Sequence, residues 1–216
     1  MLKALIIKEL RESAGIVVLA LVAYGFVWYQ VTSGELLPWQ SQQMYQTLPF
    51  VSDSFGGFLT LLIGAMAIAL GIKQSVWELG QNSYLFLLHR PAGRRLIFSV
   101  QLLVGGGLVL AVGGLAIVAY ALWVATPGNS PKPFFWSMTG SAWQLTACLL
   151  LVYLGTFLSG IRPARWFGTR LAPLVTSGGV AFAVSGALWW VATVAIAAVA
   201  LASLAGIFYY AQARDY

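Results

Sequence analysis

The strongest constraint on this chain is a series of six apolar stretches, each near the length needed to cross a lipid bilayer. A helix needs about 20 predominantly apolar residues to span a hydrocarbon core of about 30 Å. The six predicted spans are Ala14–Val31, Phe55–Ile72, Leu96–Ala125, Ser141–Ile161, Leu171–Leu188 and Trp189–Tyr210. We therefore predict an all-α integral membrane protein, with a single transmembrane domain over residues 1–216.

The composition supports lipid as the main solvent of this chain. Of its 216 residues, 60% are hydrophobic and only 8% are charged, whereas about a quarter of a soluble domain is charged. There are too few charges to cover a water-exposed surface. The last two spans adjoin, so we expect a turn near Ser185–Trp190. A single bent segment, giving five spans, is the alternative.

Lysine and arginine residues fall almost entirely in alternate loops. Eleven of the twelve lysine and arginine residues lie on one side of the predicted membrane: Lys3, Lys8, Arg11, Lys73, Arg90, Arg94, Arg95, Arg162, Arg165, Arg170 and Arg214. The other side holds only Lys132. Because basic residues are retained on the cytoplasmic side, we predict a multi-pass protein of the inner (cytoplasmic) membrane with both termini in the cytoplasm. The net charge of +6 is then a topology signal, which argues against a nucleic-acid partner.

The residues before the first span have a helical pattern of their own. Leu2, Ile6 and Leu10 recur at i, i+4 and i+8, and most charged residues lie opposite. This spacing predicts a short amphipathic helix over residues 1–12, lying on the inner membrane surface. A frayed polar tail is the alternative. Glu9 and Glu12 are unusual in a basic leader, so we expect a retained anchor and not a cleaved signal peptide.

Groups that carry chemistry are few. No ionisable residue lies deep within a predicted span, which argues against a proton-coupled carrier, although sodium sites built from backbone carbonyls stay possible. His89 is the only histidine and Cys148 the only cysteine, so neither a multi-histidine metal centre nor an internal disulfide can form. No phosphate-binding G-x-x-x-x-G-K-[ST] stretch occurs. We predict a chain that is not itself an enzyme and needs no cofactor.

Small and aromatic residues within the spans allow two interpretations each. Glycines favour ordinary helix packing within the chain, with a subunit interface or a translocation path as the alternative. They are Gly105–Gly107, Gly113, Gly114, Gly178 and Gly179. Gln101 and Gln144 are expected to form hydrogen bonds between helices near span ends. Aromatic walls without fixed charge suit a hydrophobic substrate, or are simply packed side chains. The aromatic residues are Tyr24, Tyr120, Tyr153 and Phe157.

The loop between the second and third spans, residues 73–95, combines an apolar stretch with a basic end. The sequence Tyr84-Leu85-Phe86-Leu87-Leu88 lies outside the predicted membrane. Pro91 biases the preceding residue away from helical geometry, so a short helix should end there. A loop that only retains positive charge has no need of such an apolar stretch, which predicts a protein partner or the membrane interface.

At these residues the chain resembles the ABC-2 type permease family. The resemblance rests on Glu78, a leucine-rich segment, and His89-Arg90-Pro91-x-x-Arg94-Arg95 entering an apolar helix. Lys8-Glu9-Leu10-Arg11-Glu12 is similar to the elbow helix that precedes the first span in that family. The resemblance implies six spans, a coupling loop that rests on a separate ABC ATPase subunit, and a second permease subunit. The implied coupling residues are Glu78, Tyr84, Leu85, Leu88, His89, Arg90, Pro91, Arg94 and Arg95.

The leading hypothesis is therefore the membrane-spanning permease subunit of an ATP-driven transporter, with export favoured by the resemblance. One departure from the family is that Gly186–Trp190 leaves almost no room for an outer helical element between the last two spans. A non-transporting membrane scaffold that tethers a cytoplasmic partner is the main alternative, because it also needs an apolar and basic loop. An intramembrane enzyme is disfavoured by the missing acid and base groups.

Overall fold

The computed structural model describes residues 2–33, 48–51, 54–77, 93–130, 132–163 and 166–213, and within these ranges it contains helices and turns but no strand. The α-helices are α1 (Leu2–Ser33), α3 (Phe55–Ile72), α6 (Arg94–Ala125), α7 (Gly140–Ile161), α8 (Phe167–Val184) and α9 (Trp189–Ala213). A π-helical turn, η1 (Lys73–Trp77), continues α3, and a 3₁₀ turn, η2 (Trp136–Thr139), precedes α7. The predicted all-α architecture is confirmed.

The predicted spans agree closely with the helices, apart from the first and the fifth. The predicted first span lies within α1, which begins twelve residues earlier. The predicted second span has the bounds of α3, and the third and fourth differ from α6 and α7 by one or two residues at their starts. Helix α8 begins and ends four residues before the predicted fifth span. A turn at 185–188 separates α8 from α9, which confirms the expected turn and excludes a single bent segment.

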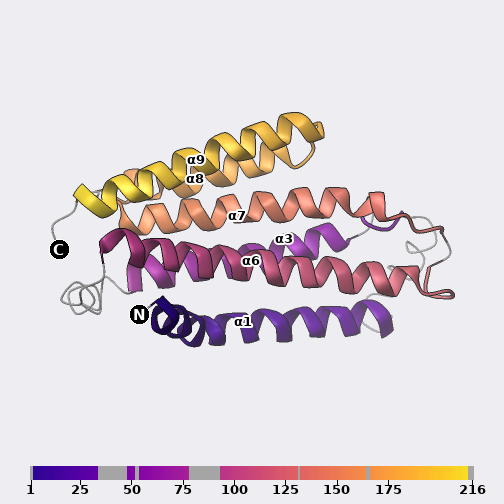
Figure 1. Ribbon diagram of the computed structural model, residues 1–216. Coiled ribbons are helices and arrows are strands. Elements are labelled where there is room, and N and C mark those ends of the chain that lie inside the picture. Colours follow the sequence, from indigo (N-terminus) through magenta and orange to yellow (C-terminus); the bar gives the residue numbers. More distant parts are fainter. Residues whose placement is uncertain are drawn as a thin grey trace.

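The helices run alternately up and down in one elongated bundle, and the start of α1 and the end of α9 lie at the same end of it (Figure 1). We call this the termini end. Helix α7 is central, because it contacts α3, α6, α8 and α9. Helices α1 and α9 lie on opposite sides of the bundle (Figure 1).

Among the described residues, five helical segments are long and apolar enough to cross a membrane: Leu2–Tyr29, Phe55–Trp77, Arg95–Ala125, Trp136–Ile161 and Trp189–Gln212. Helix α8 is not among them, although it packs along α7. Burial is uneven. In the most apolar stretch of each helix, 67% of the residues are buried in α7, but only 11% in α1 and 17% in α9. Such exposed apolar helices need lipid or another apolar surface around them, as expected for a membrane protein.

The predicted amphipathic segment is part of α1, which is helical without interruption from Leu2 to Ser33. In Figure 1 the first turns of α1 (indigo) point in a different direction from the rest of the helix. Ser13 and Gly15 lie where the predicted segment meets the predicted span, and Gly/Ser pairs are a recognised cause of helix bending. The expected elbow is therefore a bent extension of the first long helix.

Glycines of α6 allow it to approach α7 closely. A Cβ at Gly105 would collide with the Tyr153 hydroxyl, and one at Gly113 would lie 2.7 Å from Thr146 Cγ2. Packing within the chain thus accounts for these glycines. Gly178 and Gly179 of α8 face open space instead, so the intrachain interpretation does not apply to them.

Candidate functional site

Three polar side chains and one backbone carbonyl group, from four elements, meet inside the bundle at the termini end. Glu9 of α1 is only 2% exposed, and Gln74 of η1, Gln101 of α6 and Tyr153 of α7 are fully buried. Burying a polar group is unfavourable unless it is hydrogen-bonded, and burying a charge requires a partner. We call these four residues the polar cluster.

Gln74 is the centre of the polar cluster. Its Nε2 donates to Glu9 Oε2 and to the backbone carbonyl oxygen of Gln101, each at 3.4 Å. Its Oε1 accepts a hydrogen bond from the Tyr153 hydroxyl at 2.7 Å, and that hydroxyl also lies 3.2 Å from the Gln101 carbonyl oxygen. One amide side chain thereby connects α1, α6 and α7 to the π-helical turn that ends α3.

A set of ion pairs lies beside the polar cluster. Lys8 Nζ lies 3.1 Å from Glu9 Oε1 and 3.6 Å from Glu12 Oε1. Lys73 Nζ, on η1, lies 3.6 Å from Glu12 Oε2. The carboxylate of Glu9 thus has a cationic partner as well as an amide donor. Glu12 and Lys73 form a second connection between the start of α1 and η1.

Most of the residues that the sequence predicts for partner coupling lie outside the described residues. These are Glu78, Tyr84, Leu85, Leu88, His89, Arg90 and Pro91. Arg94 is the first residue of α6. The Arg95 guanidinium donates to Gln212 Oε1 of α9 at 3.0 Å, so it connects two helices of the same chain. The described segments therefore show where this loop leaves and re-enters the bundle, at η1 and α6.

Sequence reasoning did not find the polar cluster. The predicted stripe of Leu2, Ile6 and Leu10 is not the buried face of α1, since Leu2 and Leu10 are exposed. The buried stripe is Leu5, Glu9 and Ser13, also spaced by four residues.

The sequence carried one signal for the polar cluster. Two glutamines, Gln74 and Gln101, lie near the same end of neighbouring predicted spans, which is the termini end. Gln101 was expected to form interhelical hydrogen bonds. Its backbone carbonyl oxygen accepts them from Gln74 and Tyr153, so the expected role of its side chain stays a prediction. The expectation is confirmed for Gln144, whose Nε2 donates to the Val184 carbonyl oxygen of α8 at 2.9 Å.

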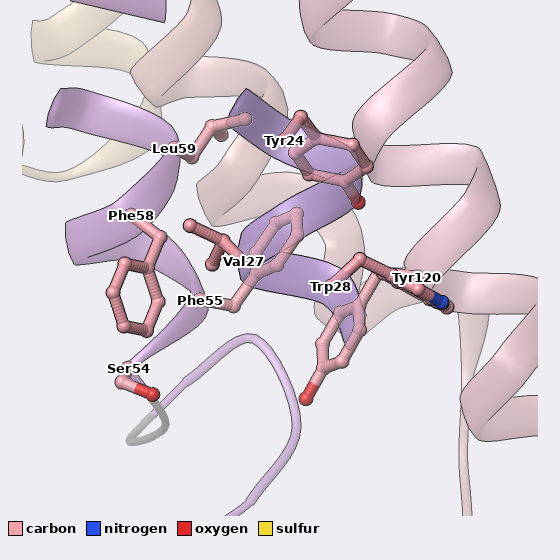
Figure 2. A pocket seen from close by; sticks show the side chains of 8 residues that line it. All are labelled: Tyr24, Val27, Trp28, Ser54, Phe55, Phe58, Leu59 and Tyr120. Atoms are coloured by element: carbon pink, nitrogen blue, oxygen red, sulfur yellow. The ribbon is translucent and has the colours of Figure 1, made fainter. Parts of the chain in front are cut away.

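A second feature, a small aromatic pocket, lies at the opposite end between α1, α3 and α6 (Figure 2). Its volume is about 40 Å³. The residues that line it are Tyr24, Val27, Trp28, Ser54, Phe55, Phe58, Leu59 and Tyr120. The Phe55 and Tyr120 rings stack with their centroids 4.4 Å apart, and the Tyr24 hydroxyl donates to the Ala116 carbonyl oxygen at 3.0 Å. The pocket wall is aromatic and carries no charge.

Of the four aromatic residues considered as walls for a substrate, only Tyr24 and Tyr120 line this pocket. Tyr153 and Phe157 are fully buried in the bundle, which matches the alternative of ordinary packing. In the part of the chain that the structure describes, no group of three or more His, Cys, Asp or Glu residues could hold a metal ion.

Chemically, the polar cluster can hold helices in a fixed register through the hydrogen bonds of Gln74. No family model matches this chain, and neither a curated protein nor a solved structure is found to be similar to it. The arrangement fits a helical membrane protein with a buried polar cluster at its termini end.

Proposed function

We propose that this chain is the membrane-spanning permease subunit of an ATP-driven transporter, and that it works with a separate ATPase subunit and a second permease subunit. The termini end would face the cytoplasm of a cell whose inner membrane holds the protein. The loop between η1 and α6 would be the docking surface for the ATPase. Direction of transport would be outward, as the family resemblance implies.

The observation that carries this proposal is a contact between the elbow-like segment and the turn that leads into the coupling-like loop. The elbow-like start of α1 forms hydrogen bonds and ion pairs with η1, the turn directly before the coupling-like loop. A scaffold that merely tethers a partner needs no buried contact between these segments. A permease does, because movement of the docked ATPase must reach the spanning helices.

The first prediction tests docking through the basic end of the loop. Arg90→Glu combined with Arg94→Glu should abolish co-purification of an ATP-hydrolysing subunit with the full-length chain, because the docking surface would change from positive to negative. The amount of chain in the membrane should be unchanged. Co-purification is measured after extraction in mild detergent, by identifying the bound subunit and its ATPase activity.

The matched control reverses the same number of charges elsewhere at the termini end. Lys3→Glu combined with Arg11→Glu alters two exposed residues of α1 and should leave the ATPase bound. If the loop variant binds the ATPase as well as the control does, the docking assignment is wrong. If no ATPase accompanies even the unsubstituted chain, the proposed class is wrong.

A further inference from the structure

The turn η1 is the irregular element on which the polar cluster acts. Lys73–Trp77 forms a π-helix directly after α3 and directly before the loop at residues 78–92. π-Helical turns are rare, because their i to i+5 hydrogen bonding is less favourable than the α-helical pattern. They occur frequently at functional sites. A turn of this kind persists only where surrounding contacts hold it.

Contacts on two sides hold η1. On one side Gln74 is bound by Glu9, by the Gln101 carbonyl oxygen and by Tyr153. On the other side Ser75 donates to the Gly71 carbonyl oxygen and lies against Gly160 of α7, where any Cβ would collide with Ser75 Oγ.

Only the loop-facing end of η1 is exposed, with Trp77 62% exposed. The buried contacts therefore fix the register of the turn, while its last residue points out of the bundle.

We propose that the polar cluster is a register lock, through which movement of η1 reaches α1, α6 and α7. This inference rests on the proposed function. Conversion of the π turn to an α-helical turn would rotate the following residues by about 100° and shift them by about 1.5 Å. Such a conversion must first break the hydrogen bonds of Gln74. A docked ATPase that favours one register shifts the equilibrium by its difference in affinity for the two.

In this arrangement Gln74 and Tyr153 are positioning residues. Their hydrogen bonds transmit movement, whereas the ATPase performs the chemistry. Glu9 extends the connection into α1. When η1 moves, α1 must either follow it or lose its hydrogen bond to Gln74.

The experiment measures the distance between the start of α1 and the end of η1. Spin labels are placed at Ile7→Cys and Trp77→Cys, both exposed, in the Cys148→Ala chain, which has no other cysteine. The full chain with its co-purified ATPase is reconstituted in lipid nanodiscs. Distances are recorded by pulsed electron paramagnetic resonance without nucleotide and with ATP and vanadate, and ATP hydrolysis is measured on the same samples.

The first test variant is Gln74→Leu, which removes the amide. The second is Tyr153→Phe, which removes a single hydroxyl and keeps the packing, so the test still works if Gln74→Leu fails to fold. The control is Gln144→Leu, which removes a comparable interhelical bond near the opposite end. We expect a nucleotide-dependent distance change in the parent and the control. In both test variants the distances should broaden, and the nucleotide response should fall several-fold while ATP hydrolysis continues.

Two results overturn the register lock, and they are distinct from failure of the proposed function. If the ATPase binds and the test variants respond to nucleotide as the Gln144→Leu control does, the register lock is wrong and the permease assignment stands. If distances broaden but the nucleotide response persists, the cluster has a purely structural role. If no ATPase binds the parent, the proposed function fails and the coupling role fails with it.

Discussion

At the scale of single residues, Gln74 shows how one side chain can organise a membrane bundle. An amide offers both donors and an acceptor, and Gln74 uses them toward Glu9, Gln101 and Tyr153. In an apolar surrounding an unsatisfied polar group is costly, so each partner depends on the others. The cluster is therefore sensitive to small changes in the space around it.

Gly105 provides a prediction at this scale. The Cβ of Gly105→Ala would collide with the Tyr153 hydroxyl and lie 2.5 Å from Gln74 Oε1. Displacing these groups should lower the free energy of unfolding by about 1–3 kcal/mol, the usual range for overpacking. The measurement is thermal unfolding of the detergent-solubilised chain.

The control for this prediction lies two residues further along the same helix. A Cβ at Gly107 meets nothing within 4 Å, so Gly107→Ala should be neutral or stabilising, by up to about 1 kcal/mol from helix propensity. Equal loss of stability in both variants would mean that the close approach at Gly105 does not exist.

At the scale of elements, α8 shows how a proline is accommodated within a helix of this bundle. Pro173 lies inside α8, and an interior proline removes one helical hydrogen bond and displaces the carbonyl four residues earlier. That carbonyl belongs to Thr169, and it accepts a hydrogen bond from the Arg162 guanidinium at 3.0 Å. The next amide, of Leu174, donates to Ser159 Oγ of α7 at 3.0 Å. Ser159 of α7 and Arg162, the residue directly after α7, thereby bind the backbone groups beside the proline.

This arrangement predicts that substitutions at Ser159 and Pro173 have interdependent effects on the free energy of unfolding. Ser159→Ala should lower the free energy of unfolding by about 1–3 kcal/mol, because the Leu174 amide loses its acceptor. In a Pro173→Ala background α8 can restore its own hydrogen bonds, so the same substitution should have a smaller effect. Unfolding of the four chains forms a double-mutant cycle. Additive effects of the two substitutions would contradict this account of α8.

The control for the cycle is Ser185→Ala. Ser185 is exposed, and its hydroxyl donates to the Phe182 carbonyl oxygen three residues earlier. Removal of this hydroxyl should change stability by less than about 0.5 kcal/mol, as expected for a surface substitution.

Helix positions were largely predictable from sequence, because apolar runs of bilayer length allow few alternatives. The bounds of α3 and the turn between α8 and α9 are examples. The early start of α8 was not predicted, because Phe167–Arg170 is not an apolar run. The helix nevertheless begins there, and Arg170 donates to the Gly160 carbonyl oxygen of α7 at 3.3 Å.

The polar cluster could not be predicted in the same way. Its members are far apart in sequence, since Glu9 and Gln74 are separated by 65 positions and Gln74 and Tyr153 by 79. Periodicity within one segment does not show which faces of different helices meet. Of the predicted coupling loop, only its entry at η1 and its exit at α6 lie within the described residues.

At the scale of the whole molecule, the two sites lie at opposite ends of the same bundle. The polar cluster joins α1, η1, α6 and α7 at the termini end, and the aromatic pocket lies between α1, α3 and α6 at the other end. Helices α1 and α6 contribute to both. A permease that is driven from its cytoplasmic loop would carry movement along these two helices to the pocket.

The most direct test of this account is whether ATP at the termini end changes the pocket at the opposite end. Phe58→Cys, half-buried in the pocket, is placed in the Cys148→Ala chain, and its reaction rate with a maleimide is measured in the nanodisc complex with its ATPase. Phe135→Cys, which is exposed and outside the pocket, is the reference. The account predicts that ATP with vanadate changes the rate at Phe58→Cys several-fold and leaves the reference rate unchanged. A rate at Phe58→Cys that is the same with and without nucleotide, while the ATPase is bound and active, would contradict a transport function and indicate a scaffold.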